Sequence, residues 1–217
     1  MADDDSRSGL RYTDPDLLAW LDDLHAPLDP ALALAFTAPE REDMPAIQVG
    51  RSEGRLLSLL VRLVGARRVV EVGTLAGFSA IHLARGLPPD GHLWTIEFDA
   101  HHADVARTNI AVAGLSDRVT VLEGAGQDLL PTLSGPFDLV FIDADKEGYD
   151  FYGRWAAANL RPGGLLLADN ACFFGKLLDP HRAAAAAVRR LHTEARDAFE
   201  TVCVPTPDGL LLGIRKG

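Results

Sequence analysis

Oxygen-bearing side chains follow two apolar runs of the sequence, and their types suit a hard metal ion. Asp143 ends the run FDLVFID, and Asp169 and Asn170 end the run GGLLLADN. If these runs are neighbouring parallel strands, their carboxyl ends meet and the three side chains converge on one point. Two carboxylates and an amide oxygen, without thiolate or imidazole, favour Mg²⁺, Mn²⁺ or Ca²⁺ over Zn²⁺. The alternative is that Asp169 caps a helix and Asp143 caps a turn.

Lys146 is the candidate general base of such a site. It stands three residues after Asp143 and could face the same pocket. A lysine whose pKa is lowered beside a divalent cation can accept a proton in catalysis. The alternative is a solvated lysine paired with Asp145 or Glu147. The seven histidines show no ligand spacing, and none is assigned to catalysis.

A glycine-bearing turn, EVGTLAGFS at residues 71–79, follows the first apolar run. Gly73 allows a tight turn and Gly77 allows close approach to a ligand. The spacing differs from the dinucleotide motif Gly-x-Gly-x-x-Gly, and the Glu71 carboxylate would repel a pyrophosphate. Glu97 closes the next apolar run about 20 residues beyond Gly77, where an acid can hold both ribose hydroxyls. Glu71 and Glu97 together suit S-adenosylmethionine, although a plain tight turn is the alternative.

The elements that must position these residues alternate along the chain. Short apolar runs bounded by Gly or Pro are separated by stretches of helical spacing, a pattern typical of βαβ units and a parallel sheet. Strands are predicted at 68–72, 92–97, 119–122, 137–142, 165–168, 201–204 and 210–214. Helices are predicted at 78–86, 99–113, 125–133, 148–160 and 181–197.

The last two predicted strands form an antiparallel hairpin, because residues 205–209 are too few for a crossover helix. The fold class is therefore α/β, with a mostly parallel sheet that ends in a hairpin and helices on both faces. Residues 13–38 predict two short helices broken at Pro27 and Pro30, and residues 50–64 predict a helix that Gly65 ends.

Length and composition fit one globular domain, predicted to span residues 1–217 with a helical arm at 1–45 and a ligand-binding core at 46–217. Hydrophobic residues make up 47% and charged residues 24%, which excludes disordered, collagenous and coiled-coil classes. Lys and Arg number 21 against 31 Asp and Glu, a net charge of −10. This sign is opposite to that of a general nucleic-acid or anionic-membrane binder, so nucleic acid is not the expected partner.

The cellular setting expected from the sequence is the cytoplasm. Cys172 and Cys203 are too few for a disulfide framework and are expected to be buried thiols. The first eight residues do not resemble a secretory signal. Apolar runs all fall short of the ~20 residues of a membrane span, so no membrane contact is expected.

In the order and content of its motifs the chain resembles the cation-dependent class I O-methyltransferases, the family of caffeoyl-coenzyme A and catechol O-methyltransferases and their bacterial relatives. The similarity runs from Ile47 to the C-terminus. Its motifs are IQVGRSEGRLLSLLVRL, VVEVGTLAGFSAIHLA, WTIEFDA, LEGAGQDLLP, FDLVFIDADKEGYDFY, LRPGGLLLADN and PDGLLLGIRK. The resemblance implies a Rossmann-like methyltransferase sheet.

The resemblance also implies roles for particular residues. The metal ligands would be Asp143, Asp169 and Asn170. The catalytic pair would be Lys146 and Asp143. The residues that line the S-adenosylmethionine site would be Val49, Glu71, Gly73, Thr74, Ser79, Glu97, Gly126 and Asp143. The acceptor would meet Lys146, Asn170, Phe173 and Phe174, the last two standing where many bacterial relatives have tryptophan.

The expected reaction moves the methyl group of S-adenosylmethionine to one hydroxyl of a catechol-type small phenolic, with Mg²⁺ as the expected cation.

A homodimer is also expected. Apolar stripes run along residues 13–38, where they include Leu17, Leu18, Leu21 and Leu24, and along residues 50–64. The alternatives are a tRNA hydroxyuridine methyltransferase using a basic patch of Arg182, Arg189 and Arg190, a nicotinamide-dependent oxidoreductase, and a binding module without catalysis.

Overall fold

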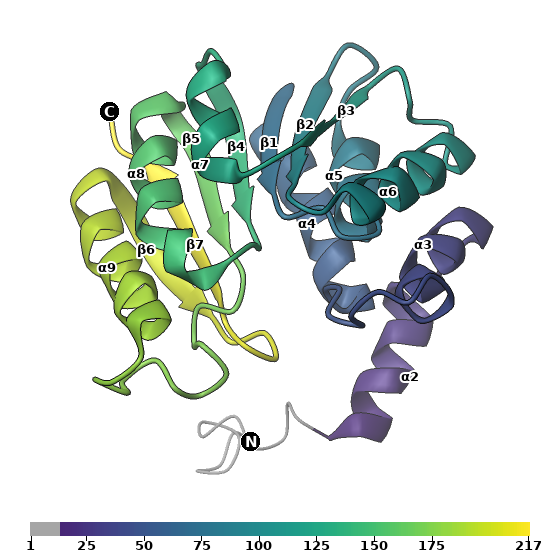
Figure 1. Cartoon of the computed structure of the whole chain (residues 1–217), viewed down its shortest axis with the longest axis horizontal. Helices are drawn as coiled ribbons and strands as arrows, with labels where there is room; N and C mark the ends of the chain where they lie inside the picture. Colours follow the sequence, from purple (N-terminus) through teal and green to yellow (C-terminus); the bar gives the residue numbers. More distant parts are fainter. Residues whose placement is uncertain (1–13) are drawn as a thin grey trace.

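A seven-stranded sheet in the order β3-β2-β1-β4-β5-β7-β6 organises the computed structural model, which describes residues 14–217 (Figure 1). Strands β1 to β5 run parallel, while β7 pairs antiparallel with both β5 and β6. The predicted fold class is therefore confirmed. The bounds are β1 Arg68–Val72, β2 His92–Glu97, β3 Val119–Glu123, β4 Phe137–Ile142, β5 Leu160–Ala168, β6 Phe199–Val204 and β7 Leu210–Arg215.

Helices cover both faces of the sheet, as expected of parallel strands that are buried on both sides. Val69 and Val70, adjacent on β1, show the division: Val69 belongs to the apolar cluster that includes α4, α5 and α6, and Val70 to the cluster that includes α8 and α9. The bounds are α2 Pro15–His25, α3 Pro30–Arg41, α4 Arg51–Val64, α5 Phe78–Gly86, α6 Ala100–Val112, α7 Gly126–Leu129, η2 Leu130–Thr132, η3 Lys146–Gly148, α8 Tyr149–Asn159 and α9 Ala183–Ala198.

Several boundaries differ from the predicted ones, most of them by one or two residues. The helix predicted at 125–133 divides into α7 and the 3₁₀ turn η2, because Pro131 lacks the N–H that an α-helix would use there. Strand β5 begins at Leu160 rather than at 165, since a register shift lets Leu160 pair with Phe137 before the regular ladder starts. Strand β6 begins two residues earlier than predicted.

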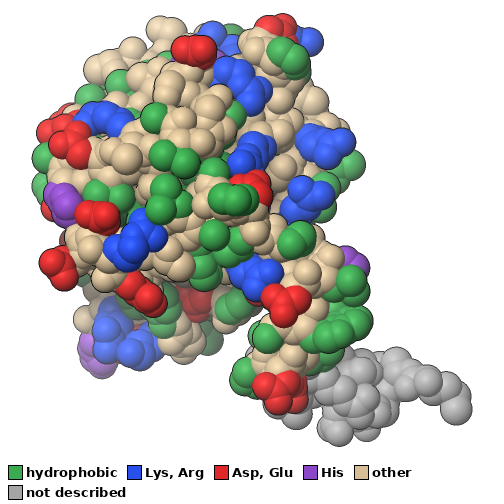
Figure 2. Space-filling model, turned by 90° about the vertical axis from the view of Figure 1, so that its right-hand side faces the viewer, with side chains coloured by type: hydrophobic (Ala, Val, Ile, Leu, Met, Phe, Trp, Pro, Cys, Tyr) green, Lys and Arg blue, Asp and Glu red, His purple; other side chains and the backbone are tan. Residues whose placement is uncertain are grey.

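The two predicted N-terminal helices are present, and prolines begin them. Pro15 and Pro30 stand in the first turns of α2 and α3, each preceded by an aspartate that caps the helix. None of the α2 side chains is buried, and Trp20 is 61% exposed. Figure 2 shows hydrophobic side chains on the lobe at the lower right of the view. The first 13 residues of the predicted arm lie outside the described range.

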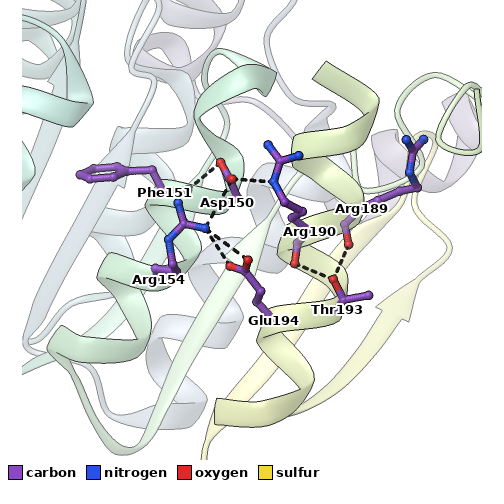
Figure 3. A network of polar contacts seen from close by, with 7 residues as sticks. All are labelled: Asp150, Phe151, Arg154, Arg189, Arg190, Thr193 and Glu194. Atoms are coloured by element: carbon purple, nitrogen blue, oxygen red, sulfur yellow. Dashed lines mark hydrogen bonds and ion pairs between the residues drawn. The ribbon is translucent and has the colours of Figure 1, made fainter. Parts of the chain in front are cut away.

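Ion pairs fasten α9 to α8, the helix that follows the Lys146 turn (Figure 3). Nε of Arg190 donates to Oδ2 of Asp150 at 2.8 Å, and Nη1 of Arg154 lies 2.9 Å from Oε2 of Glu194. Exposed pairs each add about 0.2–1 kcal/mol, so these contacts contribute little to the stability of the fold.

The arginines that the sequence offers as an RNA-binding patch are engaged by the protein itself. Arg190 pairs with Asp150, and Arg182 donates to the Asp179 carboxylate at 3.1 Å. Arg189 donates to the backbone oxygen of Asp179 at 2.9 Å. This arrangement does not favour the tRNA alternative.

Within residues 14–217 the structure contains no helix both long and apolar enough to cross a bilayer.

His82 gives the folded chain a dependence on pH. Its ring is buried against Phe78 on α5, its Nε2 has no hydrogen-bond partner among residues 14–217, and burial lowers its pKa from 6.5 to about 4. The neighbouring charges are Arg85 and Arg55, which also lower the pKa, and Asp29, which opposes them. Between these pH values the unfolded chain binds a proton that the folded chain excludes. This ring therefore lowers the stability of the fold as the pH falls from 6.5 to 4.

Substituting His82→Phe is expected to remove about 1–3 kcal/mol of that pH-dependent loss. The measurement is the free energy of unfolding by urea at pH 7 and pH 5, with His181→Gln on the surface as the control. If the free energy of unfolding fell equally between pH 7 and pH 5 in wild type and in His82→Phe, the folded protein would accept a proton on this ring as readily as the unfolded chain does.

Candidate functional site

A cavity of about 880 Å³ opens at the carboxyl ends of the parallel strands, where ligands bind in open α/β sheets. Its wall includes most of the residues that the sequence predicts: Val49, Gly73, Thr74, Ser79, Glu97, Gly126, Asp143, Lys146, Asn170 and Phe174. Three other predicted residues, Glu71, Asp169 and Phe173, lie behind this wall. The fold therefore brings the predicted cofactor and acceptor residues into one space.

The turn after β1 fits tightly against the end of β4. Gly73 has a φ of 95°, and a Cβ at this position would lie 1.9 Å from the backbone oxygen of Asp143. A side chain here would force the two strand ends apart. Gly73 thus sets the distance between the cofactor turn and the Asp143 segment, in addition to the close ligand approach expected from the sequence.

Backbone amides hold the Glu97 carboxylate rigidly in the cavity wall. Oε2 accepts from the N–H of Thr74 at 3.0 Å and of Leu75 at 2.7 Å, and Oε1 accepts from Asp99 at 3.0 Å. A carboxylate has about four acceptor positions, so capacity is left for a ligand hydroxyl. His102, which also lines the cavity, places Nδ1 3.6 Å from Oε1.

Glu71 occupies a different place from Glu97. It is fully buried, and the hydroxyl of Thr95 donates to its Oε2 at 2.5 Å. Burial raises the pKa of Glu71 to about 8. The hydroxyls of Thr95 and Thr74 lie 2.5 Å apart, so a short polar chain connects this acid to the cavity wall. Its predicted contact with a cofactor stays a prediction.

Lys146 is fixed by two contacts at the edge of the cavity. Its Nζ donates to Oδ1 of Asp143 at 3.1 Å and to the hydroxyl oxygen of Tyr149 at 2.6 Å. The Tyr149 hydroxyl in turn donates to the backbone oxygen of Asp169 at 3.1 Å. Burial raises the pKa of Tyr149 well above its usual value, so this hydroxyl stays neutral. The solvated-lysine alternative does not describe this geometry.

Asp143, Asp169 and Asn170 form a cluster of oxygen donors beside Lys146. Burial and the nearby Asp143 raise the pKa of Asp169 to about 7, and Nδ2 of Asn170 donates to Oδ2 of Asp169 at 3.2 Å. Within residues 14–217 no three His, Cys, Asp or Glu side chains gather as a metal site. The donor set here is two carboxylates and one amide, which fits a hard divalent cation that would balance the paired negative charge.

The two adjacent phenylalanines have different environments. Phe174 is 60% exposed and lines the cavity, whereas Phe173 is buried in the core beneath it.

Cys172 and Cys203 are both exposed, contrary to the expectation of buried thiols. Cys172 stands where the segment after Asn170 packs against the β6–β7 turn, its N–H donating to the backbone oxygen of Asp208 at 2.8 Å, a tertiary contact that no local pattern encodes.

Several wall residues were not identified from the sequence. Phe98 is 78% exposed at the cavity and follows Glu97 directly, and Gln127 follows Gly126. Tyr152 lines the cavity and donates its hydroxyl to Oδ1 of Asp145 at 2.5 Å. Adjacency to predicted site residues was the available signal for Phe98 and Gln127, whereas Tyr152 stands six residues beyond Lys146 and had no such signal.

The sequence matches known proteins over most of its length. An O-methyltransferase family model matches residues 30–216. A catechol O-methyltransferase of Mycobacterium tuberculosis is 47% identical over 178 residues, which is 81% of each chain. A catechol O-methyltransferase of Niastella koreensis is 41% identical over 210 residues, covering 91% of this chain and 95% of its own.

A solved structure agrees with these sequence matches. The O-methyltransferase TomG from Streptomyces achromogenes, crystallised in complex with SAM, matches this fold with a TM-score of 0.87. The two chains are 36% identical, and the match covers 93% of this chain and 96% of that one. With a family model that spans residues 30–216, the chain belongs to the S-adenosylmethionine-dependent O-methyltransferases.

Proposed function

We propose that this enzyme transfers the methyl group of S-adenosylmethionine to one hydroxyl of a catechol-type phenolic, with a divalent cation held by Asp143, Asp169 and Asn170. The observation that carries the proposal is the placement of the Lys146 amine, 3.1 Å from Asp143, in the same cavity as the cofactor turn. The names of the two bacterial relatives support the acceptor class.

The protein's contribution to the reaction is position and proton transfer. Lys146 takes up the proton that the acceptor hydroxyl loses, and Asp143 and Tyr149 hold its amine toward the cavity. The oxygen–carbon bond forms as the carbon–sulfur bond breaks, and the thioether leaves with the electron pair. A divalent cation, when bound, would lower the pKa of the acceptor hydroxyls and hold both oxygens of a vicinal diol.

The acceptor class is tested by comparing catechol with two matched phenols. Two adjacent hydroxyls are needed for chelation, so phenol and 2-methoxyphenol are expected to react at least ~100-fold more slowly than catechol. The measurement is methyl transfer from labelled S-adenosylmethionine under identical conditions. Phenol methylated as fast as catechol would show that chelation does not select the acceptor.

Glu97→Ala is expected to weaken cofactor binding by about 1.5–3 kcal/mol, because charge-assisted hydrogen bonds to the ribose are lost. Calorimetric titration with S-adenosylhomocysteine measures this loss, and titration with NAD is expected to show no binding. Asp104→Ala on the outer side of α6 provides a carboxylate control. Tight binding of NAD would support the nicotinamide alternative instead.

The exposed apolar residues of α2 fit a homodimer. Leu17, Leu18, Trp20 and Leu24 are all exposed on this helix, which extends away from the sheet. Light scattering is expected to give about twice 23.3 kDa at micromolar concentration. Trp20→Asp is expected to shift the mass toward that of one chain, and a wild-type mass of 23.3 kDa would contradict the dimer.

A further inference from the structure

The segment 170–175, here named the acceptor loop, has a backbone that its own residues do not favour. Asn170, Phe173 and Phe174 have φ values of 51°, 49° and 52°, in the left-handed region, which asparagine adopts readily but which costs each phenylalanine about 1–2 kcal/mol. Phe174 is 60% exposed, so burial of its ring does not compensate for this cost. The buried ring of Phe173 and the hydrogen bond from its N–H to the backbone oxygen of Asn170 at 2.9 Å stabilise the first part of the loop, so support for Phe174 has to come from contacts outside the loop.

The turn between β6 and β7 supplies those contacts through its backbone. The N–H of Ala171 donates to the backbone oxygen of Gly209 at 2.8 Å, and the N–H of Cys172 donates to that of Asp208 at 2.8 Å. Gly209 has a φ of 78°, and a Cβ there would lie 2.6 Å from Sγ of Cys172. The turn and the acceptor loop thus pack directly against each other.

The side chain of Asp208 makes the contact nearest the cavity. The N–H of Phe174 lies 2.8 Å from Oδ1 and 3.0 Å from Oδ2 of Asp208. Hydrogen bonds to an ionised acceptor are about twice as strong as neutral ones. This carboxylate therefore fixes the residue whose ring lines the same cavity as Lys146 and Asn170.

We propose that Asp208 is a positioning residue that determines acceptor specificity by holding Phe174 in its left-handed conformation at the cavity wall. The proposal rests on the proposed function, since it takes the cavity beside Lys146 as the acceptor site. Asp208 is not among the residues that line the cavity, so it would act through the backbone of Phe174. Its effect falls on how the acceptor is oriented and bound.

The test compares Asp208→Ala and Asp208→Asn with wild type on a catechol that carries one side chain. Asp208→Ala is expected to raise the acceptor KM about tenfold and to change the meta-to-para product ratio, with kcat within about threefold and cofactor affinity unchanged. Asp208→Asn keeps one acceptor oxygen and is expected to fall between the two. Asp179→Ala removes a loop-capping carboxylate after the acceptor loop and is expected to change neither quantity.

Hydrogen exchange at the Phe174 amide measures the same contact without any acceptor. Exchange is expected to be faster in Asp208→Ala and unchanged in Asp179→Ala. A folded Asp208→Ala with wild-type KM, product ratio and exchange would overturn the proposal, as would a parallel fall in kcat and cofactor affinity, which indicates structural support only. If wild type does not turn over catechol while exchange responds as expected, it is the proposed function that fails, and acceptor control by Asp208 fails with it.

Discussion

Lys146→Ala is expected to slow methyl transfer to catechol by about 10²–10⁴-fold, because the amine that takes up the acceptor proton is lost. Affinity for cofactor and metal is expected to change far less, since the proposed role of Lys146 is proton transfer. Lys146→Arg is not expected to restore the rate, because a guanidinium keeps its proton at neutral pH. Single-turnover rates and calorimetric titrations measure the two effects separately.

Two companion variants make this test specific. Lys176→Ala removes an exposed lysine from a neighbouring loop and is expected to leave the rate unchanged. Tyr149→Phe removes the hydroxyl that accepts from Nζ at 2.6 Å and is expected to slow transfer roughly tenfold. A Lys146→Ala enzyme within a few-fold of wild type at pH 7 would show that the acceptor loses its proton without this amine.

Asp169→Asn is expected to abolish stabilisation by Mg²⁺ and to remove most methyl transfer. The substitution keeps the size of a buried side chain but takes away one of two adjacent carboxylates. Without metal, the variant is expected to be at least as stable as wild type, because an uncompensated buried charge beside Asp143 is gone. Thermal unfolding with and without Mg²⁺ measures both effects.

The same experiment separates a ligand from a structural aspartate. If Asp169 only capped the following turn, Asp169→Asn would lower stability in both conditions and Mg²⁺ would affect the variant and wild type alike. Asp169→Ala removes the ligand entirely and is expected to abolish metal binding while the sheet remains folded, because the residue stands at the open end of β5.

Local patterns in the sequence were enough to place the elements that build the site. Apolar runs bounded by glycine or proline located the strands β4 and β5, and the expected parallel pairing of these two strands placed Asp143 at the same edge of the sheet as Asp169 and Asn170. The lengths of the connections then fixed the hairpin. These features depend on residues close together in the chain, which is why they could be predicted.

The orientation of individual side chains depends on tertiary contacts and was harder to predict. Phe173 and Phe174 are adjacent and similar, yet only Phe174 lines the cavity, because the hairpin turn holds the backbone between them. Glu71 and Glu97 are both acids predicted to contact the cofactor, but only Glu97 lines the cavity, whereas Glu71 is fully buried behind the cavity wall. Tyr149 was missed because its role appears only when Lys146 and Asp169 come together.

The most direct test of metal-assisted catechol methylation is the rate of wild-type enzyme after exhaustive treatment with EDTA, then after addition of Mg²⁺ or Mn²⁺. Binding of S-adenosylhomocysteine, followed in parallel, is the control that the protein remains folded. We predict loss of methyl transfer in EDTA, recovery with either cation, and cofactor binding throughout. Full transfer to catechol in the absence of any divalent cation would contradict the account.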